Sequence, residues 1–200
     1  MGSVVKVSED DFESALGIVL SVLRSGGVFI YPTDTVYGIG GDATSHAVIE
    51  KIHRIKGSDP QKPMSVMMAD FGMVDEYCET GLWEDMVLER YLPGPYTFIL
   101  RERVPIPVSG TNRIGIRIPD SPFCQALCAA FGKPIVSTSA NIHGMSAPAD
   151  FADIDKKLID LVMVALDAGA TKYRKSSAII DLVEKKITRE NGEVVRIMEE

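Results

Sequence analysis

The side chains best suited to chemistry are small hydroxyls and amides that directly follow a hydrophobic run. In KPIVSTSANIHG, residues 133–144, that run predicts a short buried strand ending in a polar loop. Strand ends that hold a ligand in α/β proteins have this pattern. Such groups can hydrogen-bond phosphate, ribose or an amino acid, whereas none of them is a strong base. The side chains concerned are Ser137, Thr138, Ser139 and Asn141.

Two lysines flank a second polar loop. Lys56 and Lys62 enclose the segment GSDPQ, and Arg54 lies two residues before Lys56. Phosphate groups are commonly bound by lysine and arginine. A lysine at a helix C-terminus is also favourable without a ligand, so both explanations stay open. We expect Lys56, at a helix end, to contribute little to packing.

Arg113 and Arg117 belong to a third segment, around the predicted strand IGIRI (114–118). Side chains alternate along a strand, so both arginines share one face and the isoleucines share the other. An unpaired arginine in a central strand is costly. It therefore meets an internal carboxylate or faces a cleft that holds an anionic ligand, and we favour the cleft.

Thr33, Asp34 and Thr35 follow the apolar run VFIY and a proline. Taken alone, they are explained more simply by a capped turn than by a ligand site.

Motifs of several common enzyme classes are missing. No G-x-S-x-G motif surrounds Ser139, and of His46, His53 and His143 only His143 is close to it in sequence, which gives a serine hydrolase little support. The sequence has no Walker A motif, and GIGG at 38–41 lacks the strand-to-helix context of a dinucleotide-binding loop.

The composition is that of an ordinary globular protein. The chain has 200 residues, 46% hydrophobic and 24% charged, which predicts one domain spanning 1–200. The net charge of −7 argues against tight nonspecific nucleic-acid binding but allows a local basic cleft. No signal peptide or membrane-spanning run is found, and three sparse cysteines suit a reducing cytoplasm. Cys124 and Cys128 share a predicted helix face, where core packing explains them better than a metal.

Helices and strands alternate along the chain, which predicts an α/β fold with a mixed parallel and antiparallel sheet and flanking helices. Residues 70–92 are expected to be mostly helical and to turn Trp83, Met86, Val87 and Tyr91 inward. Further helices are expected from Ser8 to Gly26 and over 45–56, 122–131 and 153–159. Strands are expected at 28–31, around Val36, at 63–68, 96–100, 114–118 and 135–136, within 161–169, at 176–182, and in a closing hairpin of 186–190 with 193–197.

Five motifs occur in an order that resembles the YrdC-type threonylcarbamoyl-AMP synthase family. They are YPTDTVYGIGGDA, KGSDPQKPMSV, LPGPYTFIL, GIRIPDSP and STSAN, and the later SSAIIDL and VVRI also fit, so the resemblance covers about 12–197. It implies a twisted mixed sheet with a concave, positively lined cleft. It further implies condensation of L-threonine, bicarbonate and ATP, with Mg²⁺, to L-threonylcarbamoyladenylate and pyrophosphate. The product would serve a downstream transferase that makes tRNA N6-threonylcarbamoyladenosine, with tRNA contact as a further expectation.

Two other functions on this fold stay open: an RNA-binding or ribosome-assembly module, and a relative that transfers a carbamoyl group to another acceptor. The sequence also departs from the family pattern. Ser58 stands where the family usually has the arginine of Lys-x-Arg, which removes a bidentate phosphate donor. Met67 lies near a position where many longer members have histidine.

The resemblance also assigns roles to individual residues. Lys56, Arg117 and Ser139 would be catalytic, with Arg117 meeting the carboxylate of L-threonine and Thr33 or Thr35 helping to hold it. The residues implied in ATP binding are Lys56, Lys62, Arg113, Ser137, Ser139, Asn141, Ser177 and Arg196.

Overall fold

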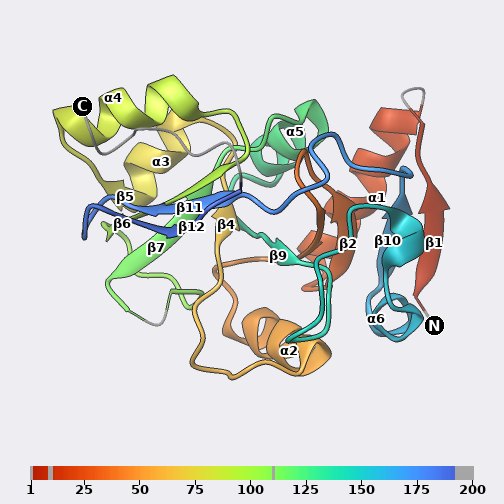
Figure 1. Ribbon diagram of the computed structural model, residues 1–200. Coiled ribbons are helices and arrows are strands. Elements are labelled where there is room, and N and C mark those ends of the chain that lie inside the picture. The colour runs from red at the N-terminus through yellow and green to blue at the C-terminus, as the bar shows by residue number, and fades with distance from the viewer. Residues whose placement is uncertain (1, 9–10, 110, 192–200) are drawn as a thin grey trace.

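The computed structural model describes residues 2–8, 11–109 and 111–191 and contains two β-sheets flanked by helices (Figure 1). A five-stranded sheet has the order β1-β10-β2-β3-β9, and a seven-stranded sheet has the order β12-β11-β6-β7-β4-β8, with β5 paired to β6. The strands are β1 (Ser3–Lys6), β2 (Phe29–Pro32), β3 (Tyr37–Gly40), β4 (Val66–Met67), β5 (Cys78–Glu79), β6 (Tyr96–Glu102), β7 (Arg113–Arg117), β8 (Ile135–Val136), β9 (Thr138–Ser139), β10 (Val164–Asp167), β11 (Ala178–Asp181) and β12 (Lys186–Arg189).

Both sheets are mixed, as the sequence predicts. β10 lies parallel to both β1 and β2, whereas β3 is antiparallel to β2. In the other sheet, β11 is parallel to β6, and β6 is antiparallel to β7. The described part of the chain therefore has an α/β fold with mixed sheets.

The structure divides the expected single sheet in two at Ser137. β8 pairs with β4 of the seven-stranded sheet, whereas β9, which begins at the next residue, pairs with β3 of the five-stranded sheet. The Ser137 N–H donates to Ser65 O at 2.7 Å, and the Val136 N–H donates to Gly41 O at 2.9 Å. The polar residues after the hydrophobic run thus lie where the chain passes from one sheet to the other.

Capping residues set the bounds of the helices. α2 (His46–Lys56) begins after Ser45, whose side chain accepts a hydrogen bond from the Val48 N–H, and ends at Gly57 in the left-handed conformation (φ 62°). α5 likewise begins after Ser121, with Pro122 in its first turn. The other helices are α1 (Phe12–Arg24), α3 (Phe71–Tyr77), α4 (Leu82–Tyr91), α5 (Pro122–Phe131), α6 (Lys156–Leu161) and the 3₁₀ turn η2 (Phe151–Asp153).

α1 and α5 pack against each other beside the five-stranded sheet, and α3 and α4 lie beside the seven-stranded sheet (Figure 1). Cys124 and Cys128 on α5 are fully buried in the core, which confirms their packing role. None of the described helices has the length and hydrophobicity that crossing a membrane requires.

One expectation for local structure needs correction. Residues 70–92 are mostly helical as expected, in two helices separated by β5, but Met86 on α4 is 70% exposed rather than turned inward. Val87 is buried, and Trp83 and Tyr91 pack against the core as expected. β12 pairs antiparallel with β11, whereas the expected hairpin partner at 193–197 lies outside the described residues.

Candidate functional site

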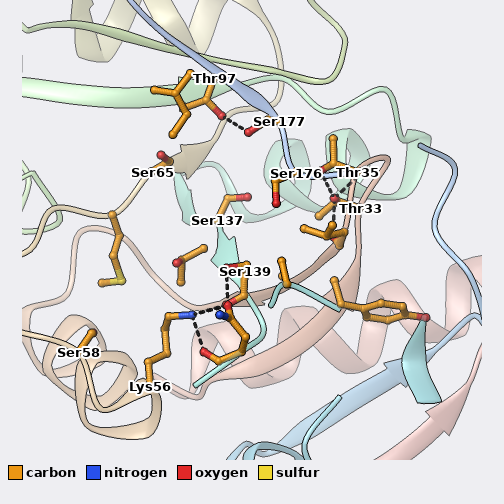
Figure 2. Close-up of a pocket in the computed structure, with 18 of the residues that line it drawn as sticks. Thr33, Thr35, Lys56, Ser58, Ser65, Thr97, Ser137, Ser139, Ser176 and Ser177 are labelled. Carbon is orange, nitrogen blue, oxygen red and sulfur yellow. Dashed lines mark hydrogen bonds between the residues drawn. The ribbon is translucent and has the colours of Figure 1, made fainter. Parts of the chain in front are cut away.

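A cavity of about 430 Å³ is lined by residues of both sheets and by the C-terminal end of α2 (Figure 2). This volume is in the usual range of small-molecule sites. The lysines and arginines that line it are Lys56, Lys62, Arg117 and Arg189, and no described Asp or Glu lines it. The cavity is therefore a cationic space with many hydroxyls, suited to an anionic ligand.

Lys56 joins the end of α2 to the loop that follows β9. Its side chain is buried, and Nζ donates hydrogen bonds to Ser139 O, to Asn141 O at 2.9 Å and to Asn141 Oδ1 at 3.4 Å. Figure 2 shows these bonds along one side of the cavity. Burial, and secondly the positive charge of Lys62, lower the pKa of Lys56 to about 8. The expectation that Lys56 contributes little to packing is wrong, because its ammonium holds a loop that is distant in sequence.

Arg117, at the end of β7, satisfies both explanations that the sequence left open. Only 5% of the residue is exposed, Nη2 forms an ion pair with Asp34, and Nη1 donates to Thr35 Oγ1 at 3.0 Å. The residue nevertheless lines the cavity. Its Nε is the only fully buried side-chain nitrogen or oxygen in the described chain that has no hydrogen-bond partner. Arg117 is thus held by a carboxylate and keeps one donor unused.

The PTDT turn is both a structural turn and part of the cavity lining. Thr33 Oγ1 donates to Val36 O at 2.7 Å and lies 2.9 Å from Thr35 Oγ1. Both threonines are buried and line the cavity. Asp34, to which the sequence assigned no ligand role, accepts from the Asp120 N–H at 3.1 Å as well as pairing with Arg117.

Ser177, directly before β11, and Arg189, at the end of β12, also line the cavity. Ser177 Oγ lies 2.8 Å from Thr97 Oγ1, and Arg189 Nε donates to Ser177 O at 2.9 Å. Burial, together with the positive charge of Arg117, lowers the pKa of Arg189. Sequence reasoning missed Arg189; its place in KITR, two residues after Ile187 and therefore on the same strand face, is the signal that could have identified it. Arg196, chosen instead, lies outside the described residues.

Arg113 does not line the cavity, contrary to the expectation that it binds ATP. Its guanidinium pairs with Asp181 at 3.4 Å and with Glu184 at 2.6 Å. The alternation that relates it to Arg117 is correct, but four residues along a strand separate the two by about 13 Å. A shared strand face therefore does not bring both arginines to one ligand.

The remaining candidates line the cavity, and Lys62 among them is exposed to solvent. Ser58 also lines it, whereas the exposed Arg54 does not. Sequence reasoning missed Ser65, Thr97 and Ser176, whose hydroxyls are near the ends of their strands. The predicted residues brought together here are Thr33, Thr35, Lys56, Lys62, Arg117, Ser137, Ser139, Asn141 and Ser177.

The chain is similar to proteins of one family. A family model described as telomere recombination, which unites Sua5, YciO and YrdC, matches residues 21–192. A threonylcarbamoyl-AMP synthase of Vibrio campbellii is 32% identical over 178 residues, covering 86% of this chain and 96% of its own.

Solved structures show the same similarity. The crystal structure of E. coli YciO has a TM-score of 0.86 and 26% identity, with coverage of 99% of this chain and 98% of YciO. P. abyssi Sua5, crystallised with L-threonine, has a TM-score of 0.85 and 25% identity over 96% of this chain, which spans 58% of that longer protein.

Proposed function

Because the chain belongs to the Sua5, YciO and YrdC family, we propose that it synthesises L-threonylcarbamoyladenylate from L-threonine, bicarbonate and ATP. Threonine and bicarbonate first give the carbamate and water. A carbamate oxygen then attacks the α-phosphorus of ATP, a C–O–P linkage forms, and the bond to pyrophosphate breaks. Every reactant of this second step is anionic, so the step calls for positioning and charge neutralisation rather than acid–base catalysis.

The observation that carries this proposal is a cavity lined by cations and hydroxyls, with no described carboxylate in its lining. We assign the L-threonine carboxylate to Arg117, which lines the cavity, and the threonine side chain to the Thr33–Thr35 turn. Arg117 keeps its orientation through Asp34. A ligand carboxylate would therefore meet a guanidinium that is already fixed in position.

We assign the nucleotide to the hydroxyl-rich side of the cavity. Ser137, Ser139 and Asn141 would surround the reacting α-phosphate, and Ser177 with Arg189 would close the nucleotide site. Lys56 would act near the phosphates mainly by holding the 139–141 loop, because its bonds to Ser139 and Asn141 already engage its ammonium. Lys62, which is exposed, keeps its charge available to the phosphates.

Mg²⁺ would enter with ATP. Since no described carboxylate lines the cavity and no cluster of three or more potential ligands occurs among the described residues, phosphate oxygens and water would supply its ligands. Bound in this way, Mg²⁺ supplies additional charge neutralisation to the triphosphate. We further infer that the product serves tRNA N6-threonylcarbamoyladenosine formation through a separate transferase, and that the two sheets act as one domain around the cavity.

The test is pyrophosphate release from Mg-ATP by the purified protein, with L-threonine and bicarbonate added separately and together. Release that requires both supports the synthase. Release with bicarbonate and an amine other than threonine would point to a different acceptor.

The cations that line the cavity also favour a second candidate function, an RNA-binding module. Binding of tRNA should therefore be titrated by filter binding across salt concentrations. Tight, steeply salt-dependent binding without pyrophosphate release would replace the synthase by that module.

A further inference from the structure

His53 lies one helical turn before Lys56, on the side of α2 that faces the cavity. Residues three apart on a helix are neighbours on its surface, and both residues line the cavity. His53 is only 4% exposed. A histidine in this position is either part of the wall or a ligand-binding group, and its surroundings decide between these roles.

Ser58 fixes the imidazole ring. Its Oγ lies 2.8 Å from His53 Nδ1, and its backbone N–H donates to His53 O at 3.1 Å. The left-handed Gly57 turns the chain back and makes these contacts feasible. A serine hydroxyl can either donate to Nδ1 or accept from it. When Ser58 Oγ donates, the imidazole carries its proton on Nε2, and this is the tautomer that the inference requires.

The other ring nitrogen, Nε2, remains available to a ligand. Among the described residues the structure gives it no hydrogen-bond partner, and Arg117 Nε is the only unpartnered side-chain atom that is fully buried. His53 Nε2 is therefore not fully buried, and His53 lines the cavity. Burial, and the positive charge of Lys56, lower the pKa of His53 against the opposing effect of Asp59. A neutral ring with an Nε2–H beside Lys56 and Lys62 is a donor suited to an anion.

The two ends of the cavity differ in what they offer. Figure 2 shows Lys56 and Ser58 at one end and Thr33 and Thr35 at the other, with Ser137 and Ser139 between them. In phosphoryl transfer the attacking and leaving groups lie roughly in line on opposite sides of the phosphorus. With the threonine carbamate near Thr33 and Thr35, the leaving pyrophosphate comes to the end formed by Lys56 and Ser58.

We propose that His53 binds an oxygen of the β- or γ-phosphate through Nε2–H, and that Ser58 is a positioning residue that sets its tautomer. The inference rests on the proposed function, which supplies the nucleoside triphosphate and the position of the threonine carbamate. Ser58, which stands where the family usually has arginine, would thus act on the phosphates through His53.

Isothermal titration calorimetry with Mg-ATP and with AMP tests the contact. His53→Ala should weaken ATP binding at least ten-fold and leave AMP binding within two-fold, because only ATP carries the outer phosphates. His53→Gln, which retains an amide donor, should recover part of the loss. Arg54→Ala is the matched control on the same helix, since Arg54 is exposed outside the cavity.

The positioning role of Ser58 needs a separate readout. Long-range ¹H–¹⁵N NMR of the imidazole should show the Nε2–H tautomer in the wild type and a mixture in Ser58→Ala, with a smaller loss of ATP affinity. A purely structural contact would lower the melting temperature and leave both the tautomer and the ATP-to-AMP affinity ratio unchanged, which would overturn the inference.

The outcomes separate this inference from the proposed function. A selective ATP defect in His53→Ala supports the contact even where the wild type releases no pyrophosphate, in which case only the synthase assignment fails. Equal loss of ATP and AMP affinity, no loss of either, or a wild type that binds no Mg-ATP would each refute the contact. If the contact is refuted, threonine-dependent pyrophosphate release by the wild type would still support the synthase assignment.

Discussion

Replacing Lys56 by methionine tests whether this side chain holds the cavity wall together. The substitution keeps the length of the buried stem and removes the ammonium that bonds Ser139 O, Asn141 O and Asn141 Oδ1. Hydrogen bonds from a charged donor contribute about 1.5–3 kcal/mol each and are not additive. Relief from burying a cation offsets part of the loss. We expect the free energy of unfolding to fall by about 1–3 kcal/mol at pH 7.

The assay is urea unfolding of the wild type and Lys56→Met, with pyrophosphate release measured in parallel. Lys51→Met makes the same chemical change on the same helix outside the cavity lining and should leave both quantities nearly unchanged. Turnover of Lys56→Met should be severely reduced, because the 139–141 loop loses its anchor. Stability at or above that of the wild type would refute this role, since burial of the cation would then outweigh the hydrogen bonds.

The titration of Lys56 gives a second measure of how the hydrogen bonds of its ammonium compare with the cost of burying the charge. Its pKa falls from 10.5 to about 8 in the folded protein, so the unfolded state binds more protons between these values. Stability therefore rises with pH over that window. Lys56→Met should lack this rise in unfolding experiments from pH 7 to pH 10.5, and an unchanged pH dependence would contradict the assignment.

Further predictions concern Arg117, the pH–rate profile and Arg113. Arg117→Ala should raise the apparent KM for threonine more than that for ATP; the opposite ranking would place Arg117 with the nucleotide. The same variant leaves Asp34 buried without its partner and should lower the free energy of unfolding by about 3–5 kcal/mol, measured by urea unfolding. The rate of pyrophosphate release should fall above about pH 8 in a single-proton step as Lys56 loses its charge, and a flat pH–rate profile up to pH 9.5 would exclude this. Arg113→Ala should keep kcat/KM within two-fold and lower the free energy of unfolding by about 1 kcal/mol or less, because its ion pairs are partly exposed and lie away from the cavity. A tenfold loss of kcat/KM would instead show that Arg113 belongs to the site.

Local signals in the sequence were sufficient to locate most helices. A serine cap and a following glycine bracket both α2 and α5, and the observed bounds match the predicted ones within a residue. Met86 was misplaced although the inward face of α4 was identified correctly. That face includes Trp83, Val87 and Tyr91, and Leu88 widens it on the side away from Met86. Helical periodicity locates the centre of a buried face better than its edges.

The residues of the site could be selected from the sequence, but their contacts could not. Lys56 and Ser139 were both chosen, yet nothing local indicates that one bonds the other across 83 positions. The division into two sheets was also missed, because it depends on which strand each half of the segment 135–139 pairs with. For Arg113 the strand face was predicted correctly but the position was not. Arg113 and Arg117 share a face of β7, but only Arg117, at the end of the strand, lines the cavity.

The placement of β10 has a consequence for how the protein is made. This strand lies between β1 and β2, so residues near position 165 must insert between two strands from the first 32 residues of the chain. The neighbouring sheet likewise needs β11, and Ser177 and Arg189, which line the cavity, both follow β10 in the sequence. On the ribosome, the N-terminal sheet can close only after most of the chain has been synthesised, because these pairings are long-range. A truncated chain consequently has no partial version of the cavity, and nucleotide binding should begin only when synthesis is almost complete.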